Sequence, residues 1–157
     1  MLRTLTLALV LAITPIASAQ ERGEPSARET AQSYLEAYSA LDLDRLATLY
    51  AESAEFNDPT STHVEGIGGP FVWHGRDAIL AGIRNWSRSI RSLHYEVERV
   101  YEASGRVVFI GAVYPEVDGP SGPVRYRYPI VTIVTIEDGL VTEHRDYTDY
   151  ASGARAP

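Results

Sequence analysis

The first part of the chain carries apolar residues at helical spacing. Between Ser26 and Leu41 they recur every three or four positions, which is the period of one helix face. Ser26 and Glu29 have the spacing of a capping box, in which each side chain accepts a hydrogen bond from the other residue's backbone N–H. The pattern predicts a helix that begins at Ser26. After Asp42, a second short helix is predicted, with the apolar residues Leu43, Leu46, Leu49 and Tyr50.

The middle of the chain changes pattern twice. A short strand from Glu55 to Asp58 is predicted to end at Pro59, because proline fixes its own φ and favours an extended residue before it. Pro59 to Pro70 is rich in Thr, Ser and Gly and is typical of a loop. A third helix is predicted from Asp77 to Ile90, because its apolar residues share one side.

From Leu93 onward the apolar residues alternate with polar ones, which is the period of a strand. Four strands are predicted, and Glu137-Asp138-Gly139 is a hairpin turn between the last two. A loop is predicted from Pro115 to Pro123. Helices followed by long strands indicate an α+β domain, in which a cone-shaped, curved antiparallel sheet is wrapped by the N-terminal helices. The strands that begin at Arg106 and Val124 are apolar on both faces, so we expect the outer face to be covered in a homodimer.

The N-terminus has the pattern of a secretory signal. Arg3 precedes the apolar run Leu5 to Ile16, and Ala17-Ser18-Ala19 is a small-residue cleavage site. The alternative, a membrane anchor, is less favoured because a spanning helix needs about 20 apolar residues. We therefore expect residues 1–19 to be removed. Residues 20–157 would then form a single exported domain, periplasmic or secreted, without stable membrane insertion.

Composition excludes several classes of function. The formal net charge of −7 makes nucleic acid an improbable partner. The sequence has no cysteine and no lysine, which excludes thiol catalysis, Cys-ligated zinc and Schiff-base chemistry. The four histidines have no third ligand at a characteristic spacing, so neither a metal nor another cofactor is expected.

Several motifs resemble one known family. They are Tyr34, Asp42-Leu43-Asp44, Phe56-Asn57-Asp58-Pro59, Gly75-Arg76-Asp77-Ala78-Ile79, and His144-Arg145-Asp146-Tyr147 with Asp149. In this order they resemble the SnoaL-like and ketosteroid-isomerase-like branches of the nuclear transport factor 2-like superfamily. The resemblance extends from about Ser26 to Tyr150. It implies the cone-shaped fold, which hosts enzymes, binding proteins and transport factors alike.

The resemblance implies roles for individual residues. Asp58 stands where the steroid isomerases keep their general base, and Tyr34 where they keep a hydrogen-bond donor. Val131 aligns with their third group, a protonated acid, and cannot donate a proton. Asp146 matches the last-strand Asp of the epoxide-hydrolase-like members, with Phe56 and Asp58 at their Tyr and Asn positions. His144 and Asp146 match the acid and histidine of the polyketide-cyclase branch.

Strand alternation predicts how these residues meet. If Val131 faces inward, Arg127 shares the inner face with it, and His144 and Asp146 share the inner face of the next strand. Arg127 and Asp146 would then pair inside the cone, whereas Tyr126, Tyr128 and Ile130 would lie on the outer, dimeric face. Phe56 and Trp86 are expected to line a pocket for a flat, small hydrophobic molecule.

Three functions remain open. The first is a general acid–base isomerase, cyclase or hydrolase of a small hydrophobic molecule, with Asp58 as base and Tyr34 or His144 as donor. The second is a non-catalytic small-ligand-binding or accessory domain of the cell envelope, favoured by the missing acid at Val131. The third is a structural dimer whose cone is filled by its own side chains. Each candidate residue also has a structural interpretation: Asp58 in an Asp-Pro turn, Tyr34 in the core, and Asp146 in an internal ion pair.

Overall fold

Three helices occupy the first half of the fold. The computed structural model describes residues 25–63 and 70–157. Helix α1 (Ala27–Ser39) starts with the predicted capping box of Ser26 and Glu29. Helix α2 (Leu43–Leu49) is capped by Asp42, which accepts a hydrogen bond from the Arg45 N–H. Helix α3 (Arg76–Trp86) is shorter than predicted, because a 3-10 turn, η2 (Ser87–Ser89), replaces its last residues. Both predicted starting points, Ser26 and Asp42, are therefore confirmed.

Seven strands form one curved sheet. Their bounds are β1 (Tyr50–Asp58), β2 (Phe71–His74), β3 (Ser92–Ala103), β4 (Arg106–Gly119), β5 (Gly122–Glu137), β6 (Leu140–Thr148) and β7 (Ala154–Arg155). The order across the sheet is β2-β1-β6-β5-β4-β3, and β7 pairs with β5. Two further 3-10 turns, η1 (Pro59–His63) and η3 (Tyr150–Ser152), follow β1 and β6. The α+β fold is confirmed, but the sheet is mixed rather than purely antiparallel, because β1 runs parallel to β6.

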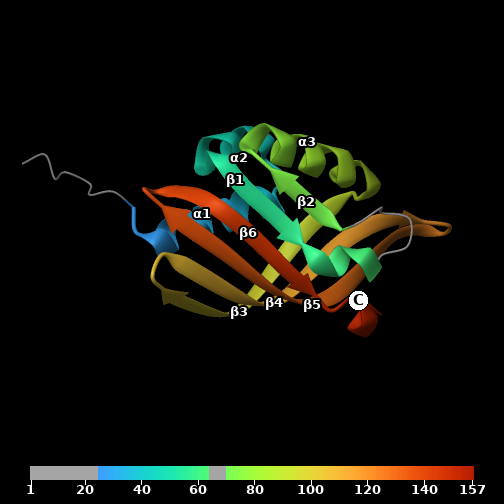
Figure 1. The fold of residues 1–157 in the computed structure, drawn as a ribbon. Coiled ribbons are helices and arrows are strands. Elements are labelled where there is room, and N and C mark those ends of the chain that lie inside the picture. The colour runs from blue at the N-terminus through green and yellow to red at the C-terminus, as the bar shows by residue number, and fades with distance from the viewer. Residues whose placement is uncertain (1–24, 64–69) are drawn as a thin grey trace, which may run out of the picture.

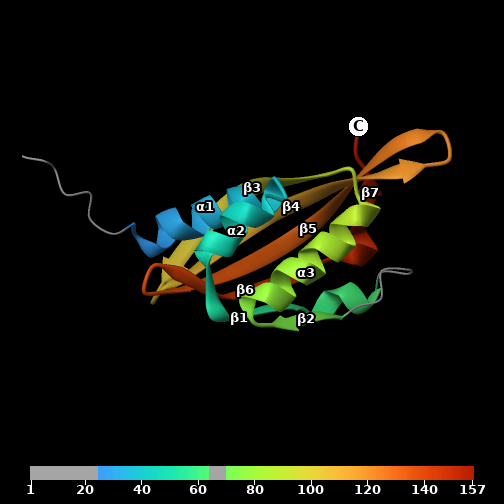
Figure 2. The same cartoon turned by 90° about the horizontal axis from the view of Figure 1, so that it is seen from above.

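The helices lie against one side of this sheet, and the sheet curls around them without closing (Figure 1). Seen from above, α1 lies along β3 and β4, whereas α3 lies nearer β1 and β2 (Figure 2). The main core fills the space between the two layers and includes Tyr34, Leu46, Ile79 and Val134, each with no exposed surface. Within the described residues, no helix is long and apolar enough to cross a membrane.

Two predicted loops contain more structure than expected. The segment Pro115 to Pro123 is not a loop, because β4 and β5 continue pairing as far as Gly119 and Gly122. The predicted loop Pro59 to Pro70 begins with the 3-10 turn η1, and β2, which follows it, pairs with β1 and was not predicted. The predicted signal sequence, residues 1–19, and residues 64–69 lie outside the described residues.

The faces of β5 are the reverse of those predicted. Ile130, Thr132 and Val134 are buried on the concave side, and Thr132 and Val134 pair with Asp146 and His144. Val131 pairs with Tyr147, which is 41% exposed, so Val131 faces the outer side. Because side chains alternate along a strand, a register error of one residue exchanges the two faces.

Candidate functional site

A cavity of about 390 Å³ opens on the concave side of the sheet. Its walls are mostly aromatic and aliphatic, and two carboxylates, Asp58 and Asp146, are among its lining residues. The aromatic lining residues are Tyr38, Phe56, Phe71, Trp86, Tyr95, Tyr126, Tyr128 and Tyr150. Cavities of this kind, apolar with a few polar groups, are the usual form of a small-molecule site.

Asp58 is the last residue of β1 and is only 4% exposed. Its Oδ1 accepts hydrogen bonds from the Thr60 N–H at 3.0 Å, the Thr60 hydroxyl at 2.6 Å and the Ser61 N–H at 3.0 Å. Its Oδ2 accepts one from the Tyr150 hydroxyl at 3.1 Å. The Asp-Pro turn therefore fixes one carboxyl oxygen and leaves the other beside a tyrosine in the cavity.

Asp146 lies on the neighbouring strand β6 and is also 4% exposed. The parallel register pairs Phe56 with His144 and Asn57 with Arg145, so Asp58 and Asp146 follow at the next position of the two strands. Adjacent strands are about 4.8 Å apart. The Thr132 hydroxyl donates to Asp146 Oδ1 at 2.5 Å. The cavity therefore holds two neighbouring carboxylates.

His144 lies behind Asp146, in the core. Its ring is fully buried and stacks on Phe56, with ring centroids 4.3 Å apart and an angle of 13° between the planes. Nε2 is 2.8 Å from Asp146 Oδ2. The ring N–H is not directed along this contact, so Nε2 makes a close electrostatic contact and no aligned hydrogen bond.

A chain of hydroxyl groups continues from the other nitrogen of His144. Nδ1 is 2.6 Å from the Tyr34 hydroxyl, which is 2.5 Å from the Tyr50 hydroxyl. Each hydroxyl has one proton to donate. Among the described residues Tyr50 has no other partner, so both hydroxyls are satisfied when Tyr50 donates to Tyr34 and Tyr34 donates to Nδ1. In this direction His144 Nδ1 accepts the hydrogen bond, and Nε2 is the ring nitrogen that faces Asp146.

Burial and like charge shape the acidity of the site. Burial raises the pKa of Asp58, hydrogen bonds from Thr60 oppose this, and the charge of Asp146 raises the pKa further. Burial also raises the pKa of Tyr34 and of Tyr150, so both phenols remain protonated at neutral pH. A raised pKa makes a carboxylate a stronger base than one in water, which is the property that a general base requires.

The predicted site residues fall into three groups. Asp58, Asp146, Phe56 and Trp86 line the cavity. Tyr34 and His144 lie one layer behind it, within the core, where His144 contacts the lining residues Asp146 and Phe56.

Arg127 and Val131 lie on the outer face, and their predicted places in the pocket are wrong. Arg127 does not pair with Asp146. Its guanidinium lies 3.6 Å from Glu98 Oε1 and donates to the Tyr114 hydroxyl at 3.2 Å. The physical reason is the exchange of the two faces of β5.

Several residues of the site were missed by sequence reasoning. Tyr126, Tyr128 and Ile130 line the cavity, although they were predicted for the outer face. Thr132, the hydrogen-bond donor to Asp146, is on the same side as these residues and has no exposed surface. The buried hydroxyl of Thr132 among apolar neighbours was a usable signal, because a threonine in a core position needs a polar partner.

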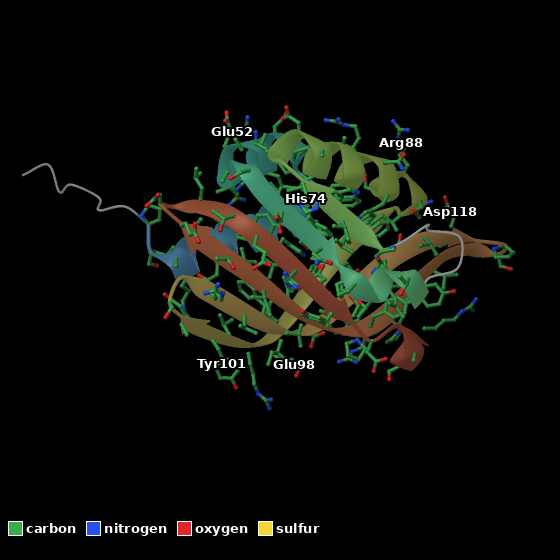
Figure 3. The ribbon with its side chains drawn as sticks, in the orientation of Figure 1. Glu52, His74, Arg88, Glu98, Tyr101 and Asp118 are labelled. Carbon is green, nitrogen blue, oxygen red and sulfur yellow. The ribbon has the colours of Figure 1, made fainter. Side chains whose placement is uncertain are left out.

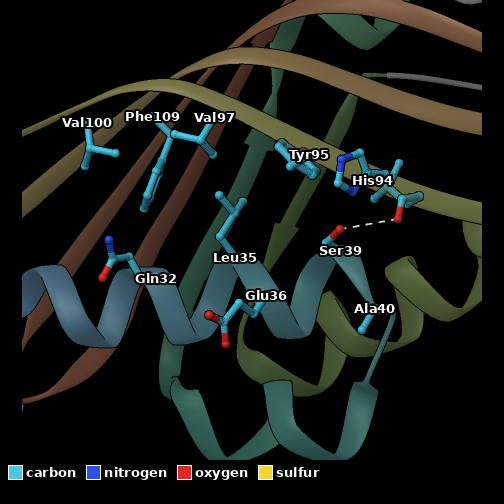
Figure 4. Close-up of a pocket in the computed structure, with 11 residues that line it drawn as sticks. Gln32, Leu35, Glu36, Ser39, Ala40, His94, Tyr95, Val97, Val100 and Phe109 are labelled. Carbon is cyan, nitrogen blue, oxygen red and sulfur yellow. Dashed lines mark hydrogen bonds between the residues drawn. The ribbon is translucent and has the colours of Figure 1, made fainter. Parts of the chain in front are cut away.

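A second, more open hollow of about 670 Å³ lies between α1 and β3. Figure 4 shows Leu35 and Ser39 of α1 directed toward β3 across it, and the Ser39 hydroxyl donates to the Leu93 backbone carbonyl of β3. Tyr95 and Leu93 line both spaces. These two residues therefore lie between the hollow and the cavity.

No group of three or more His, Cys, Asp or Glu side chains in residues 25–63 and 70–157 is placed to hold a metal ion. Asp58 and Asp146 supply carboxyl groups to the cavity, and its tyrosines, Ser89 and Thr148 supply hydroxyl groups.

Comparison with known proteins places this fold and site in one class, the SnoaL-like proteins. Residues 31–144 match the family model of the SnoaL-like domain, and the chain belongs to that family. No curated protein matches the chain in sequence.

Solved structures share the same fold. An inferred SnoaL-like polyketide cyclase from Shewanella putrefaciens CN-32 is 23% identical, with a TM-score of 0.70, over 92% of this chain and 95% of that one. An LEH-like epoxide hydrolase from M. tuberculosis is 16% identical, with a TM-score of 0.63, over 80% and 84% of the chains. TerC, crystallised with polyporic acid, is 17% identical, with a TM-score of 0.64, over 80% and 93%. The predicted family and cone-shaped fold are confirmed.

Proposed function

We propose that the protein is a general acid–base enzyme, an isomerase, cyclase or hydrolase, that acts on a small hydrophobic molecule in the cavity. One observation carries the proposal. Asp58 and Asp146, each 4% exposed, stand at neighbouring positions of adjacent strands and line the same aromatic cavity. Buried carboxyl groups are costly to keep, so the presence of two in one cavity favours a catalytic role.

Asp58 is proposed as the base. The turn at Pro59 fixes its Oδ1 through three donors, which leaves Oδ2 to receive a proton from the substrate. The Tyr150 hydroxyl, 3.1 Å from Oδ2, is placed to donate to an oxygen on which negative charge develops. Asp146 is proposed as the neighbouring carboxylate whose charge raises the pKa of Asp58, and His144 and Tyr34 as residues that orient it from behind.

The comparisons with solved structures support a pocket for a small hydrophobic molecule. The structurally similar M. tuberculosis protein is an epoxide hydrolase, and TerC was crystallised with polyporic acid. A second candidate function, ligand binding without chemistry, is favoured by the burial of Tyr34 and His144 behind the wall. Neither of these predicted proton donors lines the cavity.

The proposal is tested by exchange of carbon-bound hydrogen. The protein is incubated in D₂O with a panel of small apolar ketones and 1,3-dicarbonyl compounds, and loss of C–H signals is followed by NMR. A parallel panel of epoxides is tested for diol formation. We expect turnover of at least one compound, and a loss of about 100-fold in Asp58→Asn, in the range for a general base.

Asp138→Asn is the matched control. Asp138 has a φ of +50° in the exposed turn between β5 and β6, a conformation that asparagine also adopts. This variant should retain full activity. If Asp58→Asn is as active as Asp138→Asn, Asp58 is not the base. If no compound turns over but ligands bind in the cavity, the binding protein is the better description.

We also propose that the protein is exported, to the periplasm or beyond the cell, after removal of residues 1–19. The support is the Arg3 start, the apolar run and the Ala17-Ser18-Ala19 site. The intact mass of protein from an exporting host should correspond to a chain that begins at Gln20. A full-length mass in the soluble exported fraction would contradict this.

A further inference from the structure

The cavity contains negative groups but, among the described residues that line it, no positive one. Asp58 and Asp146 line it, and no Arg or His does. His144 touches Asp146 from the core and is not among the lining residues. On the cavity side, the two carboxylates therefore face hydrogen-bond donors and aromatic rings but no cationic side chain.

Two arginines that flank the lining tyrosines of β5 are engaged elsewhere. Arg125 and Arg127 alternate with Tyr126 and Tyr128 along β5, so they face the opposite side of the strand. Arg125 pairs with Glu116 at 3.6 Å and Arg127 with Glu98 at 3.6 Å. Neither guanidinium is free to neutralise the cavity.

The walls suit a cation as well as an apolar body. Tyr126 and Tyr128 stack with ring centroids 6.1 Å apart, and Tyr150 meets Tyr128 edge-on at 5.4 Å. Trp86 meets Tyr38 edge-on at 6.4 Å. Aromatic faces attract a cation within about 6 Å, and groups of such rings bind quaternary ammonium ligands.

We propose that the cavity selects an organic cation, a protonated or quaternary amine attached to a flat apolar body. The inference rests on the proposed function in one respect, that the cavity is the ligand site. The ammonium group lies near Asp58 and Asp146 and supplies the charge that the wall lacks, while the apolar body lies against the tyrosines. A cavity of about 390 Å³ is at the small end of ligand sites, which measure roughly 300–1,000 Å³.

Physical chemistry favours this ligand over its alternatives. An anion would meet two carboxylates in a poorly solvated space and would be repelled. A neutral molecule would gain apolar contacts only. A cation is attracted to both carboxylates and reduces the repulsion between them. Complementary charge of this kind gives a binding site its specificity.

Three probes of one size test the proposal on the unmodified protein. Isothermal titration is performed with benzyltrimethylammonium, its neutral carbon analogue neopentylbenzene, and phenylacetate, in one buffer with one cosolvent. We expect the cation to bind about tenfold or more tighter than the neutral probe, given the strength of cation–π and charge contacts. Phenylacetate should bind weakest.

Two variants locate the charge effect. Asp146→Asn removes one negative charge from the wall, and Glu98→Gln removes one from the outer face, where Figure 3 shows Glu98 pointing away from the helices. Asp146→Asn should weaken binding of the cation about tenfold and leave the neutral probe within about twofold. Glu98→Gln should change neither. An equal loss in both variants would show a response to net charge and overturn the proposal.

The outcomes separate this proposal from the proposed function. If the neutral probe binds as tightly as the cation, the cation inference is wrong, whereas the exchange assay in D₂O still decides catalysis. If none of the probes binds in the cavity, the cation inference is overturned, and the exchange and epoxide assays decide the proposed function separately.

Discussion

Asp58 is held by more of the surrounding structure than a turn residue requires. Its carboxyl group accepts hydrogen bonds from Thr60, Ser61 and Tyr150, which belong to η1 and η3. Thr60 in turn accepts a hydrogen bond from the Thr148 N–H at the end of β6. The same side chain that is proposed as the base therefore also ties the ends of two strands together.

Replacing Asp58 should reveal both roles. Asp58→Ala leaves two backbone N–H groups without an acceptor, and we expect it to lower the free energy of unfolding by about 2 kcal/mol. Asp58→Asn keeps an acceptor oxygen at Oδ1 and should lose less than half as much. Urea denaturation at neutral pH measures both. Equal stability of the alanine variant and the wild type would mean that the turn does not depend on this carboxyl group.

Some residues of the candidate site could be predicted from the sequence, and others could not. Asp58 and Asp146 were identified by resemblance, and the structure places both in the cavity. Their hydrogen-bond partners, Thr132 and Tyr150, were not identified. The segments that carry these two residues come close to the carboxyl groups only because the sheet is curved. The position of Arg127 was wrong for a related reason: Pro129, Val131 and Ile133 look as suitable for a core as Tyr128 and Ile130.

The elements themselves were easier to predict than their faces. The helix starts at Ser26 and Asp42 could be predicted because both residues are typical N-caps. The Asp138-Gly139 turn could be predicted because this dipeptide is typical of hairpin turns, and both residues have a positive φ in the structure. In β5 both faces are apolar, so alternation alone could not decide which face is inner. The extended hairpin of β4 and β5 was missed because Pro115, Pro120 and Pro123 are typical of loops.

One glycine shows how closely these strands are fitted. Strand β3 has a register shift between Val97 and Arg99, opposite Gly111 of β4. A Cβ at position 111 would lie 1.9 Å from the Glu96 carbonyl oxygen. We expect Gly111→Ala to lower the free energy of unfolding by roughly 1–3 kcal/mol, as overpacking does.

Denaturation curves of Gly111→Ala and wild type test this prediction. Gly139→Asn is a suitable control, because position 139 has a φ of +75° and open space around it. A stability of Gly111→Ala within error of the wild type would show that β3 can withdraw from β4 at little cost.

At the scale of the whole molecule, the outer face of the sheet is the surface through which a homodimer is predicted to form. Helices cover the concave side only, and Figure 3 shows Tyr101 of β3 pointing away from them. Tyr101 is 55% exposed and Tyr147 41% exposed. With Val131 on this side as well, the outer face is apolar enough to support the predicted homodimer, although through residues other than Tyr126, Tyr128 and Ile130.

A charge on this face should therefore disrupt the dimer. We expect the wild type to scatter light as a dimer at micromolar concentration and Val131→Arg to scatter as a monomer. Leu140→Arg, which adds the same charge to an exposed apolar residue at the end of the β5–β6 turn, should remain dimeric. A monomeric wild type would contradict the prediction.

The central claim, that Asp58 and Asp146 are a coupled pair of carboxyl groups, is tested most directly by their own titration. Carbon-detected NMR of the carboxyl groups gives the pKa of Asp58 in the wild type and in Asp146→Asn. We predict a wild-type pKa above 3.8, the ordinary value, because burial and the charge of Asp146 both disfavour ionisation. Asp146→Asn removes that charge and should lower the pKa of Asp58. A wild-type pKa at or below 3.8 that does not change in Asp146→Asn would contradict the account.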